Sequence, residues 1–334
     1  MRKDIFLIVV MGLIIFGKEA VADDVTGCPL GLNKGEFWPK MTINYSQATR
    51  AYWNENPEES PEMVSLPDGW HAKVFKSSLR VGYGITDNVD IGVLVPYIDK
   101  DVKKEVWKWN KKEKKWIKKP KEVKESGLAD PWFAAKYKFR FGQKKGSIQS
   151  YAVGLGIKPS MTSDELISKG IGNGAMAIRG VFLMHEPLPP FDLCGDIWYQ
   201  YNGKAKSFQV ETPEGKVDWP KSDWDLGDKI GYRMILEYEL GYKGKLAVVF
   251  GPMGWIKFKD KDKDGETVKD SDRYEHSLMV KLVYLPEEKE RFDDIAKELA
   301  AHHRKIFLGF KIPVSVKNDF SPSFMPILGW MWTF

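Results

Sequence analysis

Long apolar runs, cysteines and catalytic signatures are all scarce in this chain of 334 residues. No window approaches the roughly 18 consecutive apolar residues that a membrane-spanning helix requires, so helices are not expected to cross a membrane. The sequence also lacks a Gly-rich phosphate loop, a Cys-x-x-Cys pair and a Ser nucleophile elbow, so we expect no cofactor and no enzymatic activity. Basic and acidic residues nearly balance, 51 against 46, which argues against nucleic acid as a partner.

The one substantial apolar run lies at the amino terminus and predicts a signal peptide. Ile5–Phe16 is preceded by the basic Arg2 and Lys3 and followed by the small residues of Ala20–Ala22. This order of a basic region, an apolar region and an A-x-A site is typical of secretory signals. We therefore predict that residues 1–22 are cleaved, that the mature chain begins at Asp23, and that the protein leaves the cytoplasm.

The carboxyl-terminal residues alternate in character with a period of two, which indicates a β-strand. Its bulky set comprises Phe324, Pro326, Leu328, Trp330, Trp332 and Phe334. In a water-soluble protein such a strand would be an aggregation-prone edge. In an outer-membrane β-barrel it closes the barrel, and its apolar face meets lipid. We predict that Phe324, Leu328, Trp330, Trp332 and Phe334 belong to a barrel-closing strand.

Residues 40–334 repeat this alternation and predict an all-β fold, a closed antiparallel transmembrane β-barrel of about twelve strands. In the clearest strand, Leu128–Phe141, aromatic residues share one face and three cations share the other. Connections alternate in length, as expected of periplasmic turns and extracellular loops, so both termini are placed in the periplasm. The expected short turns are 86–88, 142–146, 186–190 and 241–244, and the expected long loops are 54–69, 99–127, 160–174, 204–227 and 259–272.

Two further segments are expected on the periplasmic side. Residues 23–39 contain glycine and proline but no periodic run, so we predict an irregular leader that is a candidate plug for the lumen. Residues 287–304 carry apolar side chains at helical spacing and end in His302, His303 and Arg304, which predicts an amphipathic helix. Cations at a helix carboxyl end are favourable, and we prefer this role for the two histidines over metal binding.

Charged residues occupy one face of several predicted strands, and we place this face toward a water-filled lumen. Cations gather near residues 76–80 and 136–140, and acids gather near 192–196 and 237–239, roughly opposite in a barrel of this size. Opposed charges would create a transverse field that discriminates among polar solutes, whereas pairs such as Asp90 with Lys138 would neutralise the interior. The predicted lumen-lining residues are Lys76, Arg80, Asp90, Lys136, Lys138, Arg140, Arg179, Asp192, Asp196, Arg233, Glu237, Glu239, Glu275 and Lys281.

The two cysteines, Cys28 and Cys194, are a candidate disulfide, because an exported protein reaches an oxidising compartment. Such a bridge would fix the leading segment to the barrel wall. Two free thiols are the alternative. Val25–Cys28 also resembles a lipoprotein processing site, but charged residues separate it from the apolar run and disfavour lipidation.

Two loops carry motifs of their own. Within 99–127, the stretch Val106–Ile117 alternates Trp and Lys and predicts a hairpin that extends beyond the membrane. We interpret it as a solvated loop beside anionic lipopolysaccharide, with polyanion binding as the alternative. Asp260, Asp262 and Asp264 match the first half of a calcium loop. The twelfth position is Ser271 rather than Glu, so we favour a solvated acidic turn over a calcium site.

Three segments carry a resemblance to a known family: Gly84–Tyr97 (GITDNVDIGVLVPY), Ser126–Pro131 (SGLADP) and Ala134–Phe139 (AAKYKF). They resemble outer-membrane proteins grouped as MetA-like transporters of phenol degradation. The likeness is firm over residues 70–160, and the closing strand also fits. The resemblance implies a barrel that passes small, often hydrophobic compounds across the outer membrane, and it carries over no substrate and no residue pattern.

The sequence therefore predicts a channel in the bacterial outer membrane for passive uptake or efflux of small molecules. A non-conducting structural or adhesive barrel is the first alternative, and a lipid-modifying enzyme is the second. Against the enzyme, His71 and Ser77 share a face but lie about 20 Å apart along one strand. The expected partners are outer-membrane lipid and lipopolysaccharide, the barrel assembly machinery acting on the terminal strand, and the small-molecule cargo.

Overall fold

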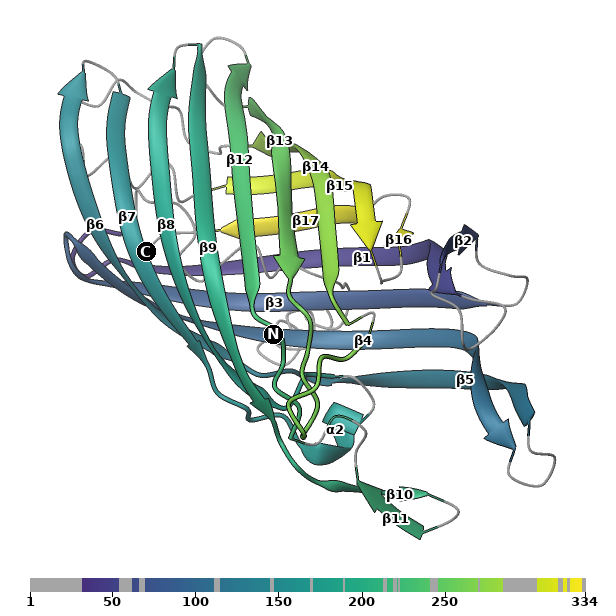
Figure 1. Cartoon of the computed structure of the whole chain (residues 1–334). Helices are drawn as coiled ribbons and strands as arrows, with labels where there is room; N and C mark the ends of the chain where they lie inside the picture. Colours follow the sequence, from purple (N-terminus) through teal and green to yellow (C-terminus); the bar gives the residue numbers. More distant parts are fainter. Residues whose placement is uncertain are drawn as a thin grey trace, which may run out of the picture.

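A computed structural model shows the chain as a closed antiparallel β-barrel of twelve strands within its described residues (Figure 1). The predicted fold class is thus confirmed. The barrel strands in chain order are β1 (Phe37–Trp53), β3 (His71–Thr86), β4 (Val89–Asn110), β6 (Trp132–Lys144), β7 (Ser147–Lys158), β8 (Ala175–Leu188), β9 (Phe191–Ala205), β12 (Lys229–Leu240), β13 (Leu246–Lys257), β14 (Arg273–Tyr284), β15 (Lys305–Lys317) and β17 (Met325–Met331).

The structure describes most of the barrel and part of its loops. The described residues are 32–53, 62–65, 70–110, 115–144, 147–168, 171–188, 190–212, 215–218, 221, 223–240, 246–269, 271–284, 305–317, 321–322 and 325–331. The predicted signal peptide, most of the leader and the predicted helix at 287–304 lie outside these residues and stay predictions.

The barrel closes because the first strand pairs with the last. Met41 of β1 lies opposite Trp330 of β17 on one side and opposite Leu79 of β3 on the other. Each of the twelve described barrel strands therefore has a neighbour on both sides, which satisfies the backbone groups that lipid cannot. β1 begins at Phe37, so the last three residues assigned to the leader belong to the barrel.

Short elements extend the barrel at the end with the long connections. β4 continues past the barrel as a ribbon with β5 (Lys115–Leu128), in which Trp109 lies opposite Trp116. This pairing confirms the predicted hairpin. The other elements are β2 (Glu62–Ser65) and β16 (Ser321–Pro322) on β1, the hairpin of β10 (Gln209–Thr212) and β11 (Gly215–Asp218), and the short helix α2 (Asp164–Ser168), which lies near that hairpin in Figure 1.

The exposure of side chains alternates along each strand. Apolar side chains are exposed and charged side chains are buried, which is the reverse of the pattern in a soluble protein. The outward side chains are large and apolar yet exposed, as in Leu155 and Leu308, each 53% accessible. Several inward side chains are charged yet buried, as in Arg179 and Lys138 at 2% and 0%. A continuous band of large apolar side chains that face outward is unfavourable in water and favourable in lipid. Within the described residues no helix has the length and apolar character needed to cross a membrane.

Aromatic side chains gather on the outer surface toward the two ends of the barrel strands. Toward the short turns, Phe191 packs on Tyr238 with ring centroids 5.3 Å apart, and Tyr151 stacks on Phe182 at 6.0 Å. Toward the long connections, the Tyr232 hydroxyl lies 3.1 Å from Nδ1 of His276. Aromatic side chains of this kind flank the apolar band of membrane barrels.

Candidate functional site

The inner wall of the barrel is the candidate functional surface, and most predicted lumen residues lie on it. Arg140 is in β6 opposite Ser150, but its side chain is outside the described part. The other predicted residues divide by exposure. Arg80, Asp90, Lys136, Lys138, Arg179, Asp196 and Glu275 are buried, and Lys76, Asp192, Arg233, Glu237, Glu239 and Lys281 are half-buried.

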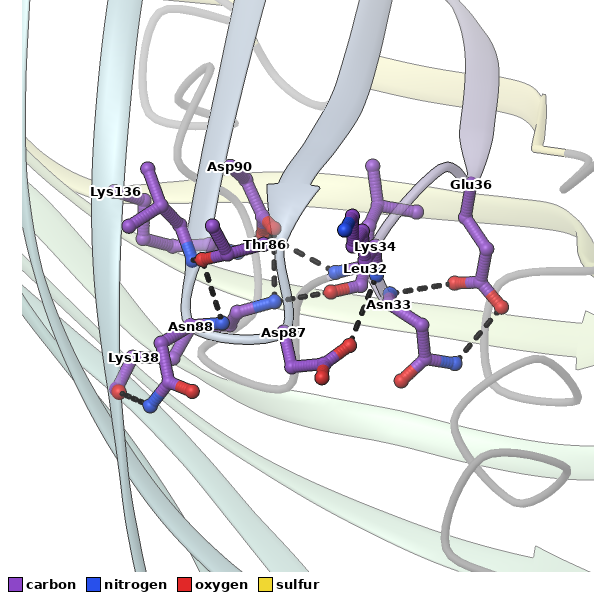
Figure 2. A network of polar contacts seen from close by, with 11 residues as sticks. Leu32, Asn33, Lys34, Glu36, Thr86, Asp87, Asn88, Asp90, Lys136 and Lys138 are labelled. Carbon is purple, nitrogen blue, oxygen red and sulfur yellow. Dashed lines mark hydrogen bonds and ion pairs between the residues drawn. The ribbon is translucent and has the colours of Figure 1, made fainter.

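A network of buried polar groups lies near the short turn between β3 and β4 (Figure 2). The carboxylate of Asp90 lies 2.8 Å from the ammonium of Lys138 and 3.2 Å from that of Lys136. It also accepts a hydrogen bond of 3.1 Å from the backbone N–H of Leu32. Lys138 donates a second hydrogen bond to the carbonyl oxygen of Leu32. Two strands of the wall thus hold the segment that precedes β1.

The neighbouring residues continue this attachment. The backbone N–H of Lys34 donates to the Asp87 carboxylate at 3.0 Å. Gly35 donates to the carbonyl of Gly84 at 2.8 Å, and Gly84 donates in return to the carbonyl of Glu36 at 2.9 Å. A Cβ at position 84 would lie 2.0 Å from a backbone oxygen of this segment, so the close approach requires glycine. We call residues 32–36, held in this way, the amino-terminal clasp.

Other inner-wall charges pair with neighbours on adjacent strands. The Arg233 guanidinium of β12 lies 2.6 Å from the Asp196 carboxylate of β9. Lys311 of β15 lies 2.6 Å from Glu275 of β14, which also accepts from the Ser277 hydroxyl at 2.7 Å. Pairing of this kind offsets the large cost of removing charges from water.

One buried cation is stacked between aromatic rings. The guanidinium carbon of Arg179 lies 4.7 Å from the ring centroid of Trp132 and 4.3 Å from that of Trp198. Its Nη2 donates to the side-chain oxygen of Gln200 at 2.5 Å. Stacking between two indoles favours the planar Arg side chain over Lys. The arrangement links β6, β8 and β9 across the inner wall.

One part of the inner wall, formed by β13, β14, β15 and β17, carries a buried apolar cluster in addition to the Glu275–Lys311 ion pair. Its buried cluster comprises Ala247, Val249, Met253, Met279, Val283, Phe307 and Ile327, with Ile235 of β12 packed against it. The outward neighbours of these residues, such as Val280 and Leu308, are exposed to the lipid side. The described interior therefore combines paired charges with apolar clusters. Methionine-rich surfaces adapt to ligands of different shape.

The connection between β7 and β8 is fastened to the barrel by Asp130, which lies between β5 and β6. Its carboxylate accepts from the backbone N–H groups of Met161 and Thr162, both at 2.7 Å, and from the Thr162 hydroxyl at 2.8 Å. Lys158 lies 3.0 Å away and also donates to Asn173. Burial raises the pKa of the Asp130 carboxyl, but the Lys158 ammonium and the Thr162 hydrogen bonds outweigh burial and hold the pKa below its ordinary range.

In the candidate calcium loop, the carboxylates of Asp260 and Asp262 contact different partners. Asp260 is buried, lies 2.5 Å from the Lys257 ammonium and accepts from the Gly227 N–H at 2.7 Å. Asp262 accepts from the Asp264 N–H at 3.0 Å within a tight turn. Among the described residues, no group of three or more His, Cys, Asp or Glu side chains is arranged to hold a metal ion.

The remaining predicted site residues are only partly described. Leu328 and Trp330 of the closing strand face outward and are exposed, whereas Phe324, Trp332 and Phe334 lie outside the described residues. Cys194 is half-buried in β9, opposite His185. Cys28 lies outside the described residues, so the disulfide stays a prediction.

The predicted lumen-lining set contains only charged residues, although aromatic and apolar residues share the same strand faces. Their signal was present, because Trp132 and Met279 have the same alternation as Lys136 and Glu275 in their strands. The clasp had no comparable signal. Its contacts join residues up to 106 positions apart and depend on closure of the barrel.

A family profile described as MetA-pathway of phenol degradation matches residues 71–293, which is more than half of the chain. No curated protein matches the sequence. A crystal structure of an outer membrane channel from Pseudomonas putida F1 is similar at a TM-score of 0.60, with 10% identity, and the match covers 91% of this chain and 97% of that one.

Two other solved structures align at lower scores. The toluene transporter TbuX of Ralstonia pickettii has a TM-score of 0.44 and 8% identity over 93% of each chain. The β domain of the Bordetella autotransporter BrkA has a TM-score of 0.46 and 9% identity over 90% of this chain and all of that domain. Of these three, the Pseudomonas channel supports a shared fold. Together with the apolar exterior, this fold places the chain in the bacterial outer membrane.

Proposed function

Because the chain belongs to the MetA-pathway-of-phenol-degradation family, we propose that it is an outer-membrane channel for passive movement of small molecules, including hydrophobic ones. The observation that carries the proposal is a closed barrel whose inner wall combines paired charges with an apolar cluster. The half-buried charged side chains of the inner wall, such as Lys76 and Glu237, remain accessible to water, and the Met and Phe side chains of the apolar cluster favour contact with hydrophobic solutes. The fold shared with the Pseudomonas channel supports this function.

The amino-terminal leader has a place in this proposal as a plug. Its last residues form the clasp, which lies against the wall at the mouth with the short turns. We propose that the leader narrows the path through the barrel.

The exterior defines the other proposed partners. The exposed apolar band contacts outer-membrane lipid, and the Lys-rich ribbon of β4 and β5 extends toward the lipopolysaccharide surface. The exposed Trp330 and Leu328 of the closing strand suit recognition by the barrel assembly machinery. None of these roles requires catalysis, and His71, a candidate partner of Ser77, instead lies 2.8 Å from Asp101.

Conductance of the purified protein in planar bilayers tests the proposal. The wild-type chain is expected to give steady currents, and deletion of residues 23–36 is expected to raise the conductance of each channel. The deletion stops before Phe37 so that β1 stays intact. Absence of current from both proteins, each shown to be folded by its heat-dependent mobility on gels, would favour the structural or adhesive barrel. Hydrolysis of phospholipid by the purified protein would favour the enzyme.

A further inference from the structure

The outer surface of the barrel has a hollow within its apolar band. The hollow encloses about 470 Å³ and is lined by residues of β3, β4, β6 and β7, which are neighbours in the wall (Figure 1). Tyr83, Ile91, Ala135 and Leu155 follow one another across these four strands in a single row. Ala135 is small and the other three side chains are large and exposed, so Ala135 forms the floor of the hollow. A volume of this size is typical of ligand sites.

The hollow opens toward lipid and is closed toward the lumen. The four strands pair with one another across this region, so their backbones form a continuous wall. On the inner side, a Cβ at Gly82 would lie 2.3 Å from the Trp38 ring, and a Cβ at Gly156 would lie 3.3 Å from the Trp132 ring. The two indole rings therefore lie against the inner surface of this wall. A molecule in the hollow has to come from the bilayer and not from the lumen.

The contacts that the hollow offers favour a flexible apolar chain. Within a bilayer the hydrophobic effect does not drive such binding, because the surrounding lipid is equally apolar, and van der Waals contact decides where a chain stays. A smooth wall contacts an acyl chain along one side. The hollow contacts the chain from its floor at Ala135 and from the larger side chains around it, such as Phe133 and Leu155. An acyl chain can adapt its torsion angles to this shape.

We propose that the hollow holds one acyl chain of a zwitterionic glycerophospholipid of the outer membrane. The hollow is continuous with the exposed apolar surface that faces lipid, and none of the described residues that line it is charged. Lipopolysaccharide is the rival occupant, but its clustered phosphates are bound best by Lys and Arg side chains. This lipid site goes beyond the proposed passage of small molecules and does not depend on it.

Photolabelling in vesicles tests the site. The folded protein is placed in phosphatidylcholine vesicles that contain a trace of phosphatidylcholine with a diazirine in one acyl chain, and the labelled peptides are mapped by mass spectrometry after irradiation. In the wild type, the label is expected to concentrate on the stretches of β3, β4, β6 and β7 that line the hollow. Ala135→Leu fills the floor and should abolish this enrichment. The control Val280→Phe adds comparable bulk to an exposed outward side chain of β14 and should leave the enrichment unchanged.

A second variant keeps the test decisive if Ala135→Leu folds poorly. Leu155→Ala removes one side of the hollow and should also reduce the enrichment. Even labelling around the apolar band would mean that lipid only surrounds the barrel and would overturn the inference, as would an enrichment that survives both substitutions. Loss of the enrichment on addition of lipopolysaccharide would assign the hollow to that lipid and overturn the phospholipid.

Conductance separates this inference from the proposed function. The Ala135 side chain faces away from the lumen, so Ala135→Leu should conduct as the wild type does. Steady currents from a protein that is labelled evenly would leave the channel standing and remove the lipid site. A barrel that shows the enrichment but never conducts would overturn the channel and keep the lipid site.

Discussion

The ammonium of Lys138 on β6 lies 2.8 Å from the carboxylate of Asp90 on β4, and both groups are buried inside the barrel. Charges are rarely buried unless they are paired and hydrogen-bonded. Here the pair is completed by both backbone polar groups of Leu32. The same two side chains therefore stabilise the wall and hold the segment that leads into β1.

Replacing Asp90 with Asn should destabilise the barrel and release the clasp. The change leaves the Lys136 and Lys138 ammonium groups buried without their carboxylate, and breaking a buried ion pair costs about 3–5 kcal/mol. We expect a decrease of that size in the free energy of unfolding, measured by urea titration in lipid vesicles. Asp87→Asn is the control, since Asp87 is exposed and receives a backbone N–H, so its loss should cost about 1 kcal/mol. Equal decreases in the free energy of unfolding of the two variants would contradict the conclusion that the buried Asp90 carboxylate contributes more than the exposed Asp87 carboxylate.

Adding one methyl group at Gly231 should disturb the inner wall. The new Cβ would meet the Trp198 ring at 2.2 Å, and overpacking of this kind typically costs about 1–3 kcal/mol. Gly180→Ala is a matched substitution in a neighbouring part of the sheet, with no atom within 4 Å of its Cβ. We expect Gly231→Ala to lower the midpoint of urea unfolding and Gly180→Ala to keep or slightly raise it. A neutral Gly231→Ala would show that the Trp198 ring moves aside at no cost.

A charge on the outer surface should be costly only where lipid covers it. Leu155 is 53% exposed in the apolar band, and Arg on the lipid face of a barrel costs about 2–4 kcal/mol at the membrane midplane. Leu155→Arg should therefore destabilise the folded barrel in vesicles by about that free energy, measured as a smaller folded fraction. Glu266→Arg, in the exposed loop, should have almost no effect. Normal folding of Leu155→Arg would place this surface outside the bilayer.

Acid should loosen the connection between β7 and β8. The pKa of Asp130 is held below its ordinary value, so its carboxylate stabilises the folded state above about pH 4, and this stabilisation is lost as the pH falls through the lowered pKa. Hydrogen exchange over residues 160–174, corrected for the intrinsic effect of pH, should rise only in strong acid. Asp130→Asn should raise exchange already at pH 7. Asp164→Asn, which affects an exposed pair with Lys206, should not. A pH-independent exchange rate would exclude Asp130 as the fastening group.

Sequence reasoning succeeded where a single strand carries its own signal. The cations of β6 and the bulky residues of β17 identify inward and outward faces because side chains alternate with a fixed period of two. The Trp and Lys repeat likewise predicted the ribbon of β4 and β5. The sequence did not predict the stacking of Arg179 between Trp132 and Trp198, because that contact depends on the register of four neighbouring strands.

What the sequence determined by itself is therefore the class of fold and the membrane environment. Alternation, turn spacing and an aromatic closing strand are local properties of the chain. None of them depends on how side chains pack in the folded barrel. What only the tertiary structure decided is which charges neutralise one another, where the inner wall is apolar and how residues 32–36 are held. These features depend on atoms brought together from distant strands when the barrel closes, and the free energy of burying a charge or an indole is set by those neighbours.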